Sequence, residues 1–241
     1  MTAPDMTAHD RHDLAATLPW MRQGTAVLLA AAGRLTDDEL RAPSTLPDWT
    51  RAHLLGHVAR NAEALTRLAT WARTGVPTPM YADREQRARE IESSSALPPT
   101  HLRQELKSTA AALDENLSAL DEAAWQARVR SALGRGIPAA EIPWMRVREV
   151  WLHAVDLAAG TTFADLPADL VDTLLDDVTG TLSTRPGCPP VRLAPTDRET
   201  TWHLGPTTAG ALTVVKAPAV EILAWVTGRA TRPEPPLPPW L

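Results

Sequence analysis

Apolar side chains recur about every 3.6 residues through the first half of the chain, and this period is typical of amphipathic helices. Proline and glycine interrupt the pattern, because both residues tend to end a helix. The predicted helices cover residues 14–35, 51–73, 83–91 and 102–120. Long helices joined by short connections favour a helical bundle for this part of the chain.

The middle of the chain begins with a strand-like stretch that contains glycine, over residues 126–137. A further helix is predicted over residues 142–159. Pro143 suits the first turn of that helix, where the missing amide hydrogen costs nothing, and Gly160 is a typical residue just beyond a helix end.

Beyond Thr162 the pattern changes to short apolar runs between two helices. The predicted elements are a helix over 166–182, strands over 191–194, 200–204 and 211–215, and a last helix over 220–227. Strands grouped with two helices, after an all-helical region, predict an α+β protein.

The domain organisation follows from that change of pattern. We expect a helical bundle over residues 1–160 and a small C-terminal α/β domain over residues 161–241, with a short antiparallel sheet. The tail of the second domain is too rich in proline for a helix or a central strand, so we expect it to lie extended on the surface. Its prolines are Pro233, Pro235, Pro236, Pro238 and Pro239.

Composition narrows the possible functions. With 44% hydrophobic and 22% charged residues, the 241-residue chain resembles an ordinary globular protein. Its net charge of −5 and the lack of a long basic run argue against nucleic acid as a partner. No signal-like N-terminus or membrane-length apolar stretch is found, so we expect a cytoplasmic protein with no membrane partner. We also expect a monomer.

The chain has one cysteine, Cys188, which excludes an intrachain disulfide and is compatible with a reducing compartment. Thiol chemistry in this protein would therefore need a thiol from another molecule.

The predicted helix 142–159 carries ionisable groups in an unusual place. One face is broadly apolar, and the opposite side holds Arg146, Glu149, His153 and Asp156 between flanks that are again apolar. Such a helix is buried, and buried charges persist only if they are paired or hold a metal ion. Glu149 and His153 are four residues apart, so their side chains reach the same point.

A third group comes from the predicted helix 51–73, in which His57 and Asn61 lie closer to the apolar stripe than His53 does. Imidazole and carboxylate together suit zinc and neighbouring divalent ions. Asn61 and Asp156 are placed to orient the imidazoles. The alternative is a polar layer without metal, in which these residues form ordinary core hydrogen bonds. The sequence pattern alone leaves both possibilities open.

Two segments of the chain closely resemble those of the mycothiol-dependent maleylpyruvate isomerases. They are residues 47–62, PDWTRAHLLGHVARNA, and residues 144–157, WMRVREVWLHAVDL. The similarity extends to residues 78–81, to residues 163–167 and to the closing Trp240-Leu241. Because the second segment is long and unusual, the resemblance is specific.

The resemblance implies a fold and a set of functional residues. Members of the family have an N-terminal DinB-like four-helix bundle and a smaller C-terminal α/β domain. A divalent metal, usually zinc, is implied at the positions of His57, Glu149 and His153. An essential arginine is implied at Arg229, in the Gly-Arg pair after the last helix. The alternative is a surface arginine that interacts favourably with the helix C-terminus.

The resemblance also implies mycothiol as the thiol cofactor. Three protein ligands leave a coordination position open, and a metal ionises a thiol that binds there. The thiolate is expected to add to the cis double bond of maleylpyruvate, and the product after rotation and elimination is fumarylpyruvate. Arg229 is expected to stabilise the negative charge that develops on the substrate, and Arg146 to contribute further positive charge.

Three other functions remain open at this point. A mycothiol S-transferase would share the first half of the reaction but keep the thiol attached to its product. A metal-dependent hydrolase would use a metal-bound water as the nucleophile. A DinB-like metal-binding module would have no enzymatic activity. Either thiol-dependent enzyme needs mycothiol and a small electrophilic molecule as its partners.

Overall fold

The computed structural model describes residues 10–206, 212–233 and 235–240. The chain divides into two compact units, a helical unit of Arg11–Thr162 and a C-terminal unit that contains Phe163–Leu241. Among the described residues, no helix combines the length and the apolar composition that crossing a membrane requires.

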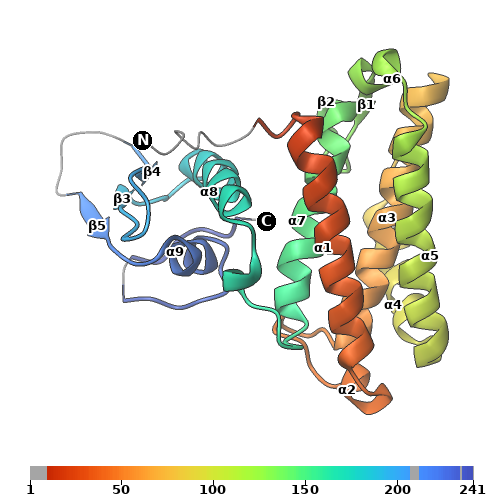
Figure 1. Ribbon diagram of the computed structural model, residues 1–241, viewed down its shortest axis with the longest axis horizontal. Helices are drawn as coiled ribbons and strands as arrows, with labels where there is room; N and C mark the ends of the chain where they lie inside the picture. The colour runs from red at the N-terminus through yellow and green to blue at the C-terminus, as the bar shows by residue number, and fades with distance from the viewer. Residues whose placement is uncertain (1–9, 207–211, 234, 241) are drawn as a thin grey trace, which may run out of the picture. The chain divides into compact units, whose positions relative to one another are not determined.

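Four long helices form a bundle in the helical unit (Figure 1), as predicted. They are α1 (Leu14–Arg34), α3 (Arg51–Thr74), α5 (Pro99–Ser118) and α7 (Ile142–Asp156). Each helix packs against two others, in the cyclic order α1, α7, α3, α5. Helix α4 (Arg84–Ser95) packs against α3 but buries only Ile91 and Ser94. Because α4 has no apolar stripe, it covers α3 and does not join the ring.

Two short helices, α2 (Asp37–Arg41) and α6 (Glu122–Gln126), were not predicted, because five residues are too few to show a helical period. A capping box starts α2: the Thr36 hydroxyl accepts from the Glu39 amide, and the Glu39 carboxylate accepts from the Thr36 amide. The strand-like stretch is an antiparallel hairpin of β1 (Arg128–Arg130) and β2 (Gly136–Pro138). A single 3₁₀ turn, Ala139–Glu141, leads from the hairpin into α7.

The contact between α1 and α7 fixes how α7 is rotated about its own axis. A Cβ atom at Gly24 would lie 2.6 Å from Nε1 of Trp151, so glycine is needed for this close approach. The indole of Trp151 donates a hydrogen bond to the carbonyl of Trp20 at 2.9 Å. Trp144 and Trp151, on the predicted apolar face of α7, are both fully buried. The ionisable residues of α7 are consequently turned away from α1.

Helix α7 ends three residues earlier than predicted, at Asp156, and not at residue 159. Its final carbonyls find partners outside the helix: the amide of Thr45 donates to the carbonyl of Asp156, and Nε of Arg51 donates to the carbonyl of Leu157. The next residue, Ala158, has a φ of +50°, which is incompatible with a right-handed helix. Tertiary hydrogen bonds therefore decide where this helix stops.

The C-terminal unit contains two helices and a small sheet. Its elements are a 3₁₀ turn at Phe163–Asp165, α8 (Ala168–Ser183), β3 (Val191–Leu193), β4 (Trp202–Leu204), β5 (Thr213–Val215) and α9 (Ala219–Val226). The strand order is β4-β3-β5. The pair β3–β4 is antiparallel, as predicted, and β5 adds a parallel partner on the other side of β3. The first residue of the predicted strand 211–215 lies outside the described residues.

The proline-rich tail differs from the prediction at its end. Its described residues, 233 and 235–240, form neither helix nor strand, as expected. Trp240, however, is only 3% exposed, and its carbonyl accepts a hydrogen bond from Nη2 of Arg185 at 3.1 Å. A large indole gains enough from burial to bring the end of the tail into the core of its unit.

Candidate metal centre

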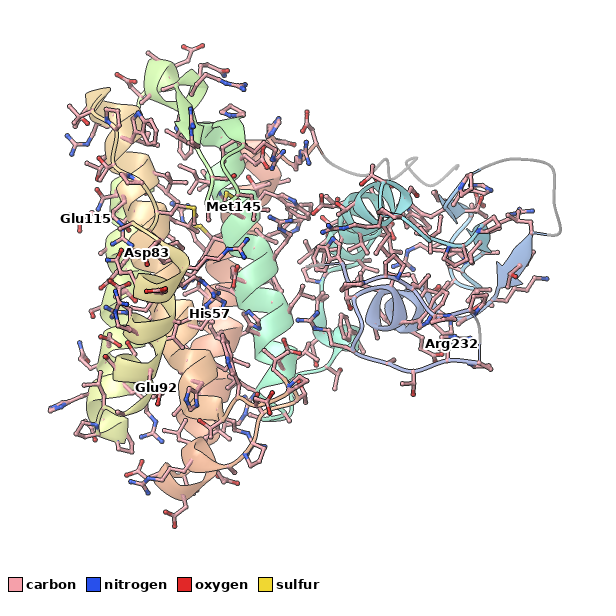
Figure 2. All side chains as sticks on the ribbon, turned by 180° about the vertical axis from the view of Figure 1, so that it is seen from behind. His57, Asp83, Glu92, Glu115, Met145 and Arg232 are labelled. Carbon is pink, nitrogen blue, oxygen red and sulfur yellow. The ribbon has the colours of Figure 1, made fainter. Side chains whose placement is uncertain are left out.

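Three side chains from α3 and α7 meet in the helical unit: His57, Glu149 and His153. Oε2 of Glu149 lies 2.9 Å from Nε2 of His57 and 3.2 Å from Nε2 of His153. One ligand atom from each residue lies within 4.8 Å of the other two. His57, labelled in Figure 2, comes from α3, and the other two residues lie one turn apart on α7. The structure brings together the three residues that the sequence singled out.

The cluster is largely buried but not closed. The side chains of His57 and His153 are 7% and 13% exposed, whereas that of Glu149 is 26% exposed. On α7, the spacing of four residues makes Glu149 and His153 project in the same direction. Since its exposed fraction is the largest, the carboxylate of Glu149 is the most accessible of the three groups.

Burial and pairing shift the three pKa values in different directions. Burial lowers the pKa of His57, although the charge of Glu149 opposes this change. Burial also disfavours charge on His153, but hydrogen bonds with Asp156 and Glu149 outweigh it and raise the pKa of this ring. Burial alone would raise the pKa of Glu149, yet the charges and hydrogen bonds of the two imidazoles hold it well below its ordinary value. The centre thus retains an ionised carboxylate at neutral pH.

Asp156 supports one of the two imidazoles. Its Oδ2 lies 2.9 Å from Nδ1 of His153, and its Oδ1 accepts a hydrogen bond from the Thr45 hydroxyl at 3.1 Å. Asp156 is fully buried. This carboxylate fixes the ring of His153 with Nε2 toward Glu149, which is how carboxylates commonly support metal-binding histidines.

Asn61 contacts Arg146 and not an imidazole, which differs from the expected role. Nη1 of Arg146 donates to Oδ1 of Asn61 at 2.9 Å and to the carbonyl of Val58 at 2.7 Å. Asn61 lies one turn beyond His57 on α3, and Arg146 lies one turn before Glu149 on α7, so the two side chains face each other across the same interface. Burial lowers the pKa of Arg146 to about 10, and the guanidinium stays charged at neutral pH.

The two remaining candidates are His53 and Arg229. His53 is at the start of α3, where its ring contacts the Thr50 hydroxyl and the carboxylate of Glu92, so it lies on the rim as predicted. Arg229 follows α9 in the C-terminal unit. Its Nη1 donates to the carbonyl of Thr227 at 2.8 Å, and its amide donates to the carbonyl of Ala224.

Arg87 and Tyr81 were not among the residues predicted from the sequence. Nη2 of Arg87 lies 3.2 Å from Nδ1 of His57, and its guanidinium lies 5.9 Å from the centre of the Tyr81 ring. Both residues line a pocket of about 640 Å³ between the α3–α4 loop and the β1–β2 turn. No sequence signal points to Arg87, because α4 is polar on all sides. Tyr81 belongs to residues 78–81, which resemble the family. The resemblance assigned no role to this tyrosine.

The donor set fits a divalent cation. Two imidazole nitrogens and one carboxylate oxygen suit zinc and its neighbours, and three protein ligands are typical of a catalytic site. If His57 binds a metal through Nε2, its ring hydrogen must be on Nδ1. A guanidinium has only donors, so the contact between Arg87 and His57 would then have to open.

Both parts of the chain match models of one protein family. Residues 21–158 match the family described as the mycothiol maleylpyruvate isomerase N-terminal domain, and residues 165–236 match the MDMPI C-terminal domain. A crystal structure of a mycothiol-dependent maleylpyruvate isomerase is 36% identical, with a TM-score of 0.88, over 95% of this chain and 99% of that chain. A second crystal structure, of a histidine-to-alanine mutant of a mycothiol-dependent maleylpyruvate isomerase, is 35% identical with the same TM-score and coverage. No curated protein matches the chain. The chain belongs to the mycothiol maleylpyruvate isomerase family.

Proposed function

We propose that this protein is a mycothiol-dependent isomerase that converts maleylpyruvate to fumarylpyruvate. The observation that carries the proposal is the cluster of His57, Glu149 and His153 in a chain of this family. Its partners are mycothiol and a small dianionic substrate, and we propose that it acts as a monomer in the cytoplasm.

His57, Glu149 and His153 would hold a divalent cation, which we propose to be zinc. When bound, the cation supplies one kind of chemistry: it lowers the pKa of an incoming thiol so that the thiolate is available at neutral pH. Glu149 contributes an ionised carboxylate, because the imidazoles hold its pKa well below the ordinary value. Asp156 keeps the His153 ring in one orientation.

The protein has no thiol of its own that suits this chemistry. Cys188 is in the C-terminal unit, is 7% exposed, and has a pKa raised by burial. A thiol with a raised pKa is largely protonated at neutral pH and is a poor nucleophile. The nucleophilic sulfur must therefore come from mycothiol.

The reaction requires no net consumption of the thiol. The sulfur forms a bond to one carbon of the cis double bond, and the π electrons move into the conjugated carbonyl group to give an enolate. The remaining single bond rotates. The enolate electrons then reform the double bond in the trans geometry as the carbon–sulfur bond breaks and the thiolate leaves.

A fixed cation near the enolate oxygen would lower the barrier to this addition. We assign this role to Arg229, on the resemblance of Gly228-Arg229 to the family. The substitution Arg229→Lys tests the assignment, because lysine keeps the charge but loses the planar pair of donors. We expect most of the turnover to be lost while the metal content is unchanged. Equal turnover would remove Arg229 from the mechanism.

One experiment tests the proposed function. Purified, zinc-loaded protein is incubated with maleylpyruvate and a small amount of mycothiol, and both the product and the free thiol are measured. We expect many molecules of fumarylpyruvate for each mycothiol, with the thiol recovered. Accumulation of a stable thiol adduct would make the protein a transferase, and conversion of the substrate without thiol would favour a hydrolase.

A further inference from the structure

Arg146 is a buried cation without an anionic partner. It is 1% exposed, and it makes no ion pair with any described carboxylate. Arg60, one residue before Asn61 on α3, shows the usual arrangement: its guanidinium pairs with Glu63 and Glu105. Burial of an unpaired charge is costly, so a protein normally keeps one only where it has a use.

The hydrogen bonds of Arg146 occupy only one side of its guanidinium. Both of its partners, the carbonyl of Val58 and Oδ1 of Asn61, bind Nη1. Nε and Nη2 are buried and have no hydrogen-bond partner. The hydrogens on Nε and Nη2 point in parallel from the same edge of the planar group, and this edge matches the two oxygens of one carboxylate.

The neighbouring carboxylate does not satisfy this edge. Glu149 lies one turn away on α7 and attracts Arg146, but its Oε2 is occupied by the two imidazoles of the candidate metal centre. The unpartnered edge therefore lies next to the reacting centre and is not used by the protein itself.

Tyr81 lies between Arg146 and the nearest described pocket in the electrostatic sense: it interacts with Arg146 and is part of the pocket lining. This ring is close enough to both Arg146 and Glu149 for electrostatic interaction, and it also lines the pocket of about 640 Å³. Two further arginines, Arg84 and Arg130, line the pocket and have no carboxylate partner among the described residues. With Arg87, the arginines of the lining outnumber its one acidic residue, Asp83, so the pocket carries a net positive charge, as a dianionic substrate requires.

We propose that the Nε–Nη2 edge of Arg146 binds one carboxylate of the substrate with two parallel hydrogen bonds. This inference rests on the proposed function, which supplies a substrate with two carboxylates. Asn61 and Val58 hold the guanidinium by Nη1 and leave its Nε–Nη2 edge available for the ligand. Arg146 is a substrate-binding residue in this proposal, and Asn61 is a positioning residue.

The variant Arg146→Lys tests the proposal in the zinc-loaded enzyme, with Arg60→Lys as the matched control. Lysine keeps the charge but cannot make the bidentate contact. A contact made equally in the ground state and the transition state affects KM more than kcat. We expect the KM for maleylpyruvate to rise at least about tenfold, with kcat, zinc content and unfolding temperature near their wild-type values. Arg60→Lys should leave KM unchanged. An unchanged KM in Arg146→Lys would overturn the proposal.

A second measurement covers the case in which Arg146→Lys does not fold. The wild-type, zinc-loaded protein is crystallised with fumarylpyruvate in the absence of mycothiol, so that no turnover occurs. We expect both oxygens of one carboxylate within hydrogen-bond distance of Nε and Nη2. Water molecules on this edge, with the product bound elsewhere, would show that Arg146 is a solvated structural residue and would overturn the proposal.

These outcomes are distinct from a failure of the proposed function. If wild-type protein does not isomerise maleylpyruvate with mycothiol present, the function is wrong. If it does, and KM and the carboxylate position are independent of Arg146, only the role of Arg146 is wrong.

Discussion

Both units of the protein bury charged groups, but they satisfy them differently. In the C-terminal unit, Nε of Arg198 donates to the buried Asp172 at 2.9 Å, and the indole of Trp202 donates to Asp176, which is exposed. In the helical unit, one carboxylate oxygen of Glu149 is shared by two imidazoles, and Arg146 has two donors with no partner.

The pKa shifts reflect the same contrast. Burial raises the pKa values of Asp172 and Asp176 in spite of their hydrogen bonds. Glu149 is partly buried as well, yet the surrounding imidazoles lower its pKa. The first two carboxylates serve the fold of their unit, whereas the surroundings of Glu149 favour its charge. Incomplete pairing around a charge that the protein maintains is typical of a site that awaits a ligand.

The substitution Glu149→Gln removes the charged group on which this contrast depends, and we expect it to have the largest effect on zinc affinity and turnover. It removes the charge between the two imidazoles and keeps the shape of the side chain. We expect a loss of more than about 100-fold in zinc affinity and a similar loss of turnover, since a ligand matters more than its supporting group. We expect similar losses of zinc affinity and turnover in His57→Ala.

Zinc content by atomic absorption, together with isomerase rates, checks this prediction. His53→Ala is the matched control, because this histidine lies one turn earlier on α3 and contacts Thr50 and Glu92. The His53→Ala variant should retain zinc. Full zinc loading and full turnover in His57→Ala would disprove the ligand set.

Asp156→Asn should have the next largest effect. The amide can still contact His153, but it no longer supports the ring with a negative charge. Supporting carboxylates of metal-binding histidines are commonly worth about 10- to 100-fold in metal affinity, and we expect a loss in that range. Competition with a chromogenic zinc chelator measures it. An affinity equal to that of the wild type would mean that Asp156 only anchors the end of α7.

Acid should weaken zinc binding about tenfold for each pH unit. The metal must displace a proton from His153, whose pKa is raised, whereas His57 has a lowered pKa and Glu149 is already ionised. Affinity should therefore fall as the pH drops below the raised pKa of His153 and level off above it. Zinc titrations between pH 5 and pH 8 test this dependence. If zinc affinity changed about 100-fold for each pH unit, two protons would be displaced together. That result would contradict the different pKa shifts of His57 and His153.

Trp202→Phe should have the smallest effect, and it should be confined to stability. The ring remains, but Asp176 loses its indole donor, which we expect to cost about 1 kcal/mol in the free energy of unfolding. Zinc affinity and KM should be unchanged. Urea unfolding and kinetic assays together check both parts, and a loss of zinc would show that this hydrogen bond also serves the centre.

The helices of the bundle and the candidate ligands could be predicted from residue spacing. The period of apolar positions gave the long helices, and the polar strip on α7 between apolar flanks pointed to buried ionisable groups. The short helices α2 and α6 could not be found in this way, because their starts depend on caps and not on a period. The end of α7 depends on Thr45 and Arg51, which are distant in sequence.

The sequence by itself determined which residue types face inward on each helix, because helical geometry is a local property of the backbone. It could not determine which inward groups meet. That Asn61 holds Arg146 and not an imidazole, and that Arg87 reaches His57 from α4, were decided only by tertiary packing. The unpartnered edge of Arg146 is likewise visible only in three dimensions, since satisfaction of a donor depends on every neighbour that surrounds it.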